Sequence, residues 1–143
     1  MPSFDRWTLA WLFGCLVFAA HIAEEVAYGS FGAYADFDVL MSALVPWLHL
    51  PPYRYETWLI NLIGACAVLF ALTWLVHLKR APMRIASFVF ATFLTLNGTG
   101  HLYAALTMDT YFPGAVTSAV MVAAGLLLFV SIPVSQNSQL STR

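Results

Sequence analysis

Charged side chains are scarce in this sequence. They make up 9% of its 143 residues, whereas hydrophobic residues make up 61%. A soluble domain carries roughly 25% charged residues. The mean hydropathy is +0.78, so there is too little polar surface to cover a water-soluble fold. The composition therefore excludes a soluble domain and predicts an integral membrane protein whose first partner is the lipid bilayer.

Basic residues and cysteines are also few. Six Lys and Arg residues and a formal net charge of −1 provide no basic surface for nucleic acid. The two cysteines, Cys15 and Cys66, lie inside apolar runs and lack the C-x-x-C spacing of a metal site. The sequence thus excludes a disulfide framework, and we interpret both thiols as small packing residues.

Four apolar runs are long enough to cross a bilayer, which takes about 20 residues. Backbone groups in hydrocarbon must be satisfied within the segment, so each run predicts a helix. We expect one all-α domain over residues 1–143, an integral membrane four-helix bundle with helices at 7–28, 56–78, 82–108 and 113–132. A cleaved signal peptide is an alternative for the first run, although its single arginine beside an aspartate makes a poor basic leader.

Lysine and arginine in the short flanks predict the orientation. The turn after the second run holds Lys79, Arg80 and Arg84, and a four-span topology places both termini on the same side as this turn. We therefore expect a multi-pass protein with both termini in the cytoplasm.

The connection between the first two helices, from Gly29 to Tyr55, is the longest in the chain. It is aromatic and is interrupted by Pro46, Pro51 and Pro52, so it is too broken to span. We expect an extracytoplasmic interfacial segment, as its aromatic residues favour that zone. A re-entrant segment is the alternative.

Small residues recur at helical spacing in the last two runs. Such residues let helices approach closely, so we expect these positions to pack in the bundle, and they would also permit a homo-oligomer. They are Ser87, Ala91 and Thr95, and Ala115, Ala119 and Ala123.

Ionisable residues inside the first and third runs break the apolar pattern. His21 shares a helix side with Glu24 and Glu25, three and four residues on. At 1.5 Å per residue, His21 lies about 22 Å beyond Arg6, and His101 lies about 25 Å beyond Arg84. The two histidines should therefore reach one level in the outer part of the membrane. Ionisable residues within a membrane are candidates for function.

Three motifs carry a resemblance to a known family. "HIAEE" at residues 21–25, "NGTGH" at 97–101 and "YFPG" at 111–114 resemble, in order and spacing, the motifs of the bacterial HXXEE-motif membrane protein family. The resemblance spans about residues 13–120. It implies a small multi-helix protein of the bacterial inner membrane and supports the site positions, but it names no reaction.

Two histidines beside two carboxylates, with no lysine or arginine nearby in the sequence, favour a bound cation or a retained proton. We expect the metal ligands to be drawn from His21, Glu24, Glu25 and His101. Two imidazoles and one carboxylate suit catalytic zinc or non-haem iron, so the implied cofactor is one divalent ion. A dinuclear site would need a further carboxylate such as Glu56.

Catalytic roles are predicted for four residues. The glutamate that is not a ligand would act as a general base or as an outer contact that supports a ligand. Asn97 would orient a ligand or a substrate oxygen, and Tyr111 would donate a proton. The candidate catalytic residues are Glu24, Glu25, Asn97 and Tyr111.

The predicted function is a membrane enzyme, metal-dependent or acid/base, acting on a lipid-like or small apolar substrate. The sequence leaves three alternatives open. They are a ligand-binding protein, a proton-coupled transport protein, and a purely structural role in which the polar groups hold the helices together.

Overall fold

The structure, a computed structural model, describes residues 4–29, 54–107 and 111–133. The described part of the chain is all-α, as predicted. Its helices are α1 (Arg6–Tyr28), α3 (Tyr55–His77), α4 (Pro82–Thr107) and α5 (Ala115–Ser131). The predicted interfacial or re-entrant segment lies almost entirely outside the described residues.

Sequence signals at both ends explain the limits of α1. The Asp5 side chain accepts hydrogen bonds from the backbone N–H of Thr8 at 3.0 Å and from its hydroxyl at 2.6 Å. An N-cap aspartate satisfies a donor that the first turn leaves open. At the other end, Gly29 adopts the left-handed conformation with φ +70° and donates its N–H to the Glu25 carbonyl, which is the usual way for glycine to terminate a helix.

The fourth helix is shorter than predicted. We expected it to run over 113–132, but Pro113 and Gly114 form a turn and α5 covers 17 residues. Gly114 has φ +85°, which is incompatible with a right-handed helix and moves the start to Ala115. By length and composition, α1, α3 and α4 qualify as membrane spans, whereas α5 is a shorter apolar helix.

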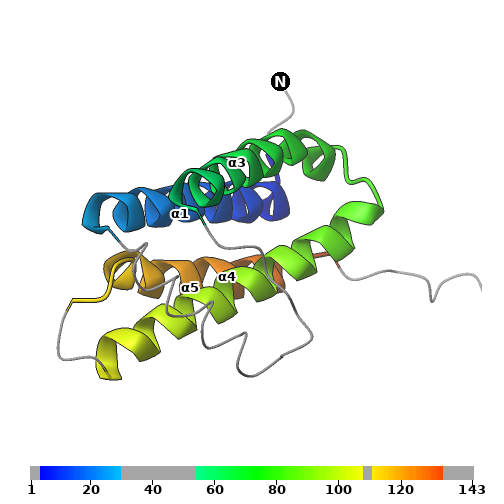
Figure 1. The fold of residues 1–143 in the computed structure, drawn as a ribbon. Helices are drawn as coiled ribbons and strands as arrows, with labels where there is room; N and C mark the ends of the chain where they lie inside the picture. Colours follow the sequence, from blue (N-terminus) through cyan, green and yellow to red (C-terminus); the bar gives the residue numbers. More distant parts are fainter. Residues whose placement is uncertain (1–3, 30–53, 108–110, 134–143) are drawn as a thin grey trace, which may run out of the picture.

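The helices form two layers, with α1 beside α3 and α4 beside α5 (Figure 1). Asp5, before α1, pairs with Lys79, after α3, at 2.8 Å, so these two helices are antiparallel. The Trp7 indole donates to Ser87 Oγ at 2.9 Å near the beginnings of α1 and α4. These two helices therefore run in the same direction, as their predicted topology requires.

Aromatic side chains of α1 fill the space between the layers. Trp11 packs against Phe90 with ring centroids 5.1 Å apart and donates its indole N–H to the Leu69 carbonyl on α3. Phe18 lies edge-on to Phe93 at 5.2 Å. This apolar packing occupies the middle of the molecule, so the polar groups described below are confined to one end.

Glycines bring α4 and α5 into close contact. A Cβ added at Gly98 would lie 2.8 Å from the Ser118 carbonyl oxygen, and one added at Gly125 would lie 2.8 Å from the Ala91 carbonyl oxygen. Our prediction for α5 was wrong here, because Ala119 and Ala123 are exposed. Ser118 and Gly125 are seven residues apart, two turns on one face, and that face meets α4.

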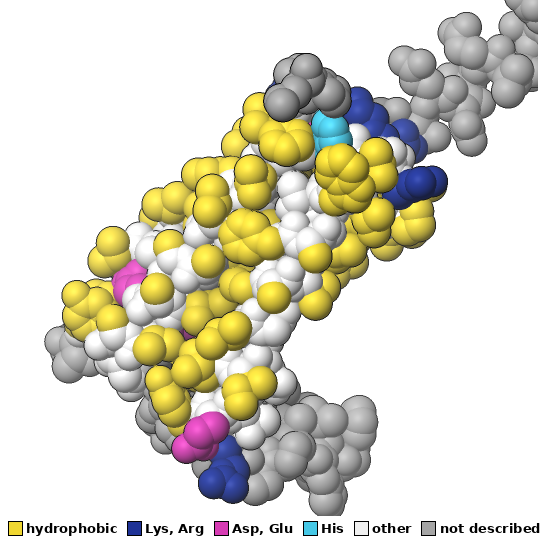
Figure 2. Space-filling view, turned by 90° about the horizontal axis from the view of Figure 1, so that it is seen from above, with side chains coloured by type: hydrophobic (Ala, Val, Ile, Leu, Met, Phe, Trp, Pro, Cys, Tyr) yellow, Lys and Arg dark blue, Asp and Glu magenta, His cyan; other side chains and the backbone are white. Residues whose placement is uncertain are grey.

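The outside of the molecule is apolar along its length. Figure 2 shows hydrophobic side chains over the long sides, with Lys and Arg gathered towards the ends. Large exposed side chains occur on every described helix, for example Leu16, Ile60, Ile85 and Val130. An exposed apolar surface of this extent suits lipid contact.

Candidate metal centre

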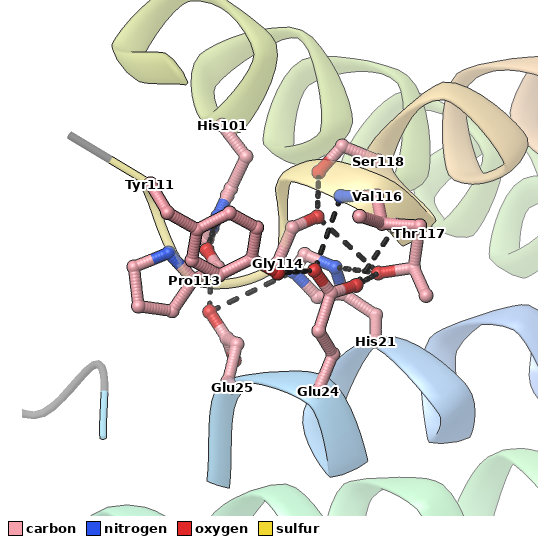
Figure 3. Close-up of polar contacts among 10 residues, drawn as sticks. All are labelled: His21, Glu24, Glu25, His101, Tyr111, Pro113, Gly114, Val116, Thr117 and Ser118. Atoms are coloured by element: carbon pink, nitrogen blue, oxygen red, sulfur yellow. Dashed lines mark hydrogen bonds and ion pairs between the residues drawn. The ribbon is translucent and has the colours of Figure 1, made fainter. Parts of the chain in front are cut away.

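Three side chains from two helices converge at the end of the molecule where α1 and α4 finish. His21 and Glu25 come from successive turns of α1, and His101 comes from α4 (Figure 3). One ligand atom from each lies within 4.8 Å of the other two. The exposed fractions are 1%, 2% and 7% respectively, so the group is almost fully shielded from the surroundings.

The Nε2 atoms of both imidazoles face the Glu25 carboxylate. His101 Nε2 lies 3.3 Å from Glu25 Oε1, and His21 Nε2 lies 3.6 Å from the same oxygen. The two rings meet edge-to-face with centroids 4.6 Å apart. The predicted common level of the two histidines is thus confirmed.

The turn before α5 determines which nitrogen of His101 carries a proton. His101 Nδ1 lies 2.8 Å from the Pro113 carbonyl oxygen. A carbonyl can only accept, so Nδ1–H is the donor. The lone pair of a neutral His101 therefore lies on Nε2, towards Glu25, as in metal-ligating histidines whose other ring N–H is bound to a carbonyl.

His21 is held in the same manner by α5 itself. Its Nδ1 lies 2.8 Å from Thr117 Oγ1. Its Nε2 is buried and has no hydrogen-bond partner among the described residues. A buried polar atom left in this state calls for an explanation, and a bound cation beside Glu25 supplies one.

Gly114 forms a wall of the site. A Cβ added at this position would lie 2.5 Å from His21 Cε1 and 2.7 Å from His101 Nδ1. Only glycine leaves room for both rings, and only glycine adopts φ +85° without strain.

The second glutamate of the motif points elsewhere. Glu24 accepts hydrogen bonds from the Tyr111 hydroxyl and from the Val116 and Thr117 backbone N–H groups, the last two at 3.1 and 2.9 Å. Glu24 was one of four predicted ligands, but the structure does not bring it into the three-residue group. Its predicted role as a general base stays a prediction.

Tyr111 lies before α5 and is about half exposed. Its hydrogen bond to the negatively charged Glu24 carboxylate raises the pKa of Tyr111 to about 12, with partial desolvation adding to the effect. The phenol is therefore protonated at neutral pH, which is the state that the predicted proton donor requires.

Two other candidate residues lie apart from the group. Asn97 is half-buried and lines an apolar hollow on α4 with Phe93 and Leu96. Glu56, which a dinuclear site would have used, is exposed and lies 3.9 Å from Arg54. Among the described residues, the group that could hold a metal ion consists of His21, Glu25 and His101, and neither Glu24 nor Glu56 belongs to it.

Sequence reasoning assigned no role to the partners of the two imidazoles. Thr117 and the Pro113 carbonyl were not among the predicted site residues, although the "YFPG" motif marked this turn. A backbone carbonyl has no signature in a residue pattern, and a threonine at the start of an apolar helix is ordinary.

The donor set fits a divalent transition metal. Two neutral imidazole nitrogens and one carboxylate are the ligands of catalytic zinc sites and of non-haem iron sites, and three protein ligands leave a coordination position open. The hydrogen bonds at both Nδ1 atoms are the outer contacts that such sites use to orient their histidines.

Fold and site together define a class: an all-α protein with helices able to cross a membrane and a buried group of two histidines and one glutamate at one end. Within that class, the model of the family described as protein of unknown function with HXXEE motif matches residues 11–129. The chain belongs to this family, and His21, Glu24 and Glu25 are the motif residues. No curated protein and no solved structure matched the chain.

Proposed function

We propose that this protein is a membrane enzyme that uses a single divalent metal ion bound by His21, Glu25 and His101. The observation that carries the proposal is the convergence of three buried donor groups within 4.8 Å. Its substrate class would be lipid-like or small apolar molecules, because the site lies at one end of an apolar bundle. We expect it in the bacterial inner membrane.

A metal ion would supply the Lewis acidity that the protein side chains lack. A bound zinc or iron ion polarises a substrate oxygen or activates water. The protein's own contribution is orientation and shielding, since Pro113 and Thr117 hold the two imidazoles and Gly114 closes one side. Three ligands rather than four favour catalysis over a purely structural site.

A metal-free proton-transfer site is the second candidate. The observation in its favour is the 3.3 Å separation of His101 Nε2 and Glu25 Oε1, which a shared proton could also bridge. In this arrangement Glu25 and a histidine would exchange the proton directly with a substrate.

Elemental analysis of the full-length protein, purified in detergent, separates these two candidates. We expect close to one zinc or iron ion per chain. The variants His21→Ala, Glu25→Ala and His101→Ala should each lose it, since two remaining ligands bind weakly.

Matched controls come from the same chain. His77→Ala and Glu56→Ala remove a histidine and a carboxylate that lie outside the group, so both should keep the metal. Circular dichroism would establish that every variant retains its helices. Folded wild-type protein that binds no metal after incubation with zinc or ferrous ion would overturn the proposal in favour of the proton-transfer site.

A further inference from the structure

Glu24 caps a helix to which it does not belong. The N-cap position of α5 is Gly114, which has no side chain to bind the open N–H groups of the first turn. The Glu24 carboxylate, from α1, accepts the N–H groups of Val116 and Thr117 instead (Figure 3). A negative charge is also favourable at this end of a helix.

The same carboxylate determines to which group the Thr117 hydroxyl donates its proton. Thr117 Oγ1 lies 2.6 Å from Glu24 Oε2. Two oxygens at this distance repel unless a proton lies between them, and the carboxylate has none to give, so the hydroxyl donates to Glu24. Its lone pairs are then left for His21 Nδ1, 2.8 Å away.

A threonine hydroxyl has only one proton. Because it is committed to Glu24, the hydrogen bond to His21 requires the proton to reside on His21 Nδ1. The Nε2 lone pair of a neutral His21 therefore points towards Glu25 and His101. The Pro113 carbonyl imposes the same tautomer on His101.

We propose that Glu24 and Thr117 are positioning residues that hold His21 in the Nδ1–H tautomer and so present its Nε2 lone pair to the metal. The two adjacent glutamates then have different tasks: Glu25 is a ligand, and Glu24 acts on the other ligand through Thr117. The use of this tautomer for metal binding rests on the proposed function, whereas the tautomer itself does not.

Nitrogen NMR of metal-free protein labelled with ¹⁵N-histidine measures the tautomer directly. The wild-type His21 signals, identified by their loss in His21→Ala, should show the proton on Nδ1. Thr117→Val keeps the shape of the side chain but removes the acceptor, so the proton should move wholly or partly to Nε2. Thr117→Ser retains the hydroxyl and should restore the wild-type pattern.

Zinc affinity, measured by competition with a chromophoric chelator, provides the second readout. Loss of an outer contact of this kind weakens metal binding by about 10–100-fold, and we expect this for Thr117→Val but not for Thr117→Ser. Thr99→Val is the matched control, because among the described residues the Thr99 hydroxyl bonds only to the Thr95 carbonyl of its own helix. It should change neither readout.

Glu24→Gln tests the same link if Thr117→Val does not fold. Each carboxylate oxygen of Glu24 accepts hydrogen bonds from two donors. A glutamine amide has only one oxygen, so it can replace only one of these two acceptors. Both His21 tautomers should therefore appear in this variant, and Glu56→Gln should have no effect.

Two results would overturn the inference: a wild-type His21 that carries its proton on Nε2, or a tautomer that does not respond to Thr117→Val. If either occurred while wild-type protein bound zinc, only the positioning role would fail. If no metal bound but the tautomer responded as expected, the proposed function would fail and the positioning role would stand.

Discussion

The geometry of the candidate metal centre depends on the absence of a side chain at Gly114. It combines a left-handed backbone, φ +85°, with direct contact to both imidazoles. Two physical penalties therefore apply to any side chain there: backbone strain of about 1–2 kcal/mol and displacement of the rings. The second penalty falls on the site itself.

Gly114→Ala should accordingly lower stability by more than about 2 kcal/mol and abolish metal binding. Gly29→Ala is the matched control, since Gly29 also has positive φ, and no atom among the described residues lies within 4 Å of an added Cβ. We expect Gly29→Ala to show the strain alone and to retain the metal. Thermal unfolding and elemental analysis measure the two effects, and retention of metal by Gly114→Ala would contradict the geometry.

Tyr111 should make the stability depend on pH in the alkaline range. Its folded-state pKa of about 12 lies above the ordinary value of 10.0 because the protonated phenol donates to Glu24. The folded state thus holds this proton more tightly than the unfolded state. The resulting stabilisation is present below pH 10 and is lost as the pH rises towards 12.

Comparison with Tyr111→Phe checks this prediction. The wild-type melting temperature should exceed that of Tyr111→Phe at pH 8, and the difference should shrink steadily above pH 10. A difference that stays constant to pH 11.5 would show that the phenol does not donate to Glu24 in solution.

At the scale of elements, α5 connects the site to the bundle. Thr117, in its first turn, contacts His21, and Pro113, in the turn before it, contacts His101. The middle of α5 packs closely against α4 at Gly98 and Gly125. A small separation of α4 from α5 would therefore move His101 relative to the turn that orients it.

Gly98→Ala tests this mechanical link. The new Cβ would lie 2.8 Å from the Ser118 carbonyl oxygen and 2.9 Å from Val122 Cγ2, and overpacking of this kind costs about 1–3 kcal/mol. We expect a lower melting temperature and weaker zinc binding. Gly100→Ala, two residues along the same helix, meets no described atom within 4 Å, and it should leave both properties at their wild-type values or raise stability slightly.

At the scale of the whole molecule, the surface pattern determines how the chain would sit in a bilayer. Three helices have the length and composition of membrane spans, and α5, at 17 residues, falls at the short end of the usual range of about 17–25. Lys79 and Arg80 lie in the turn between α3 and α4, and Arg84 follows in the first turn of α4. The excess of positive charge predicts that this turn faces the cytoplasm.

Cysteine labelling with a membrane-impermeant maleimide tests this topology. In a Cys15→Ala/Cys66→Ala background, Glu56→Cys should react from outside intact cells and Arg80→Cys should react only after the membrane is opened. The reverse pattern would invert the topology, and labelling of both sites in intact cells would exclude a span between them.

Much of this arrangement was predictable from the sequence. The four helices follow from apolar runs whose backbone must be satisfied internally, and the common level of His21 and His101 follows from a constant rise per residue in two parallel helices. Pro82 begins α4 as expected. The predicted start of the last helix, residue 113, was two residues too early, because the positive φ of Gly114 is not visible in composition.

The division between Glu24 and Glu25 was decided by the tertiary structure. Adjacent residues point about 100° apart around a helix, so the two side chains cannot both point into the same site. The packing of α4 and α5 against α1 determines which of the two does. The same holds for Asn97, which shares a helix face with His101 and yet lines an outer hollow, and for Thr117, whose role depends on a carboxylate 93 residues away. Local chemistry along the chain therefore determined the helices and the depth of their polar groups. Contacts between helices, which depend on rotation about each axis and on one glycine turn, decided which of those groups share a site.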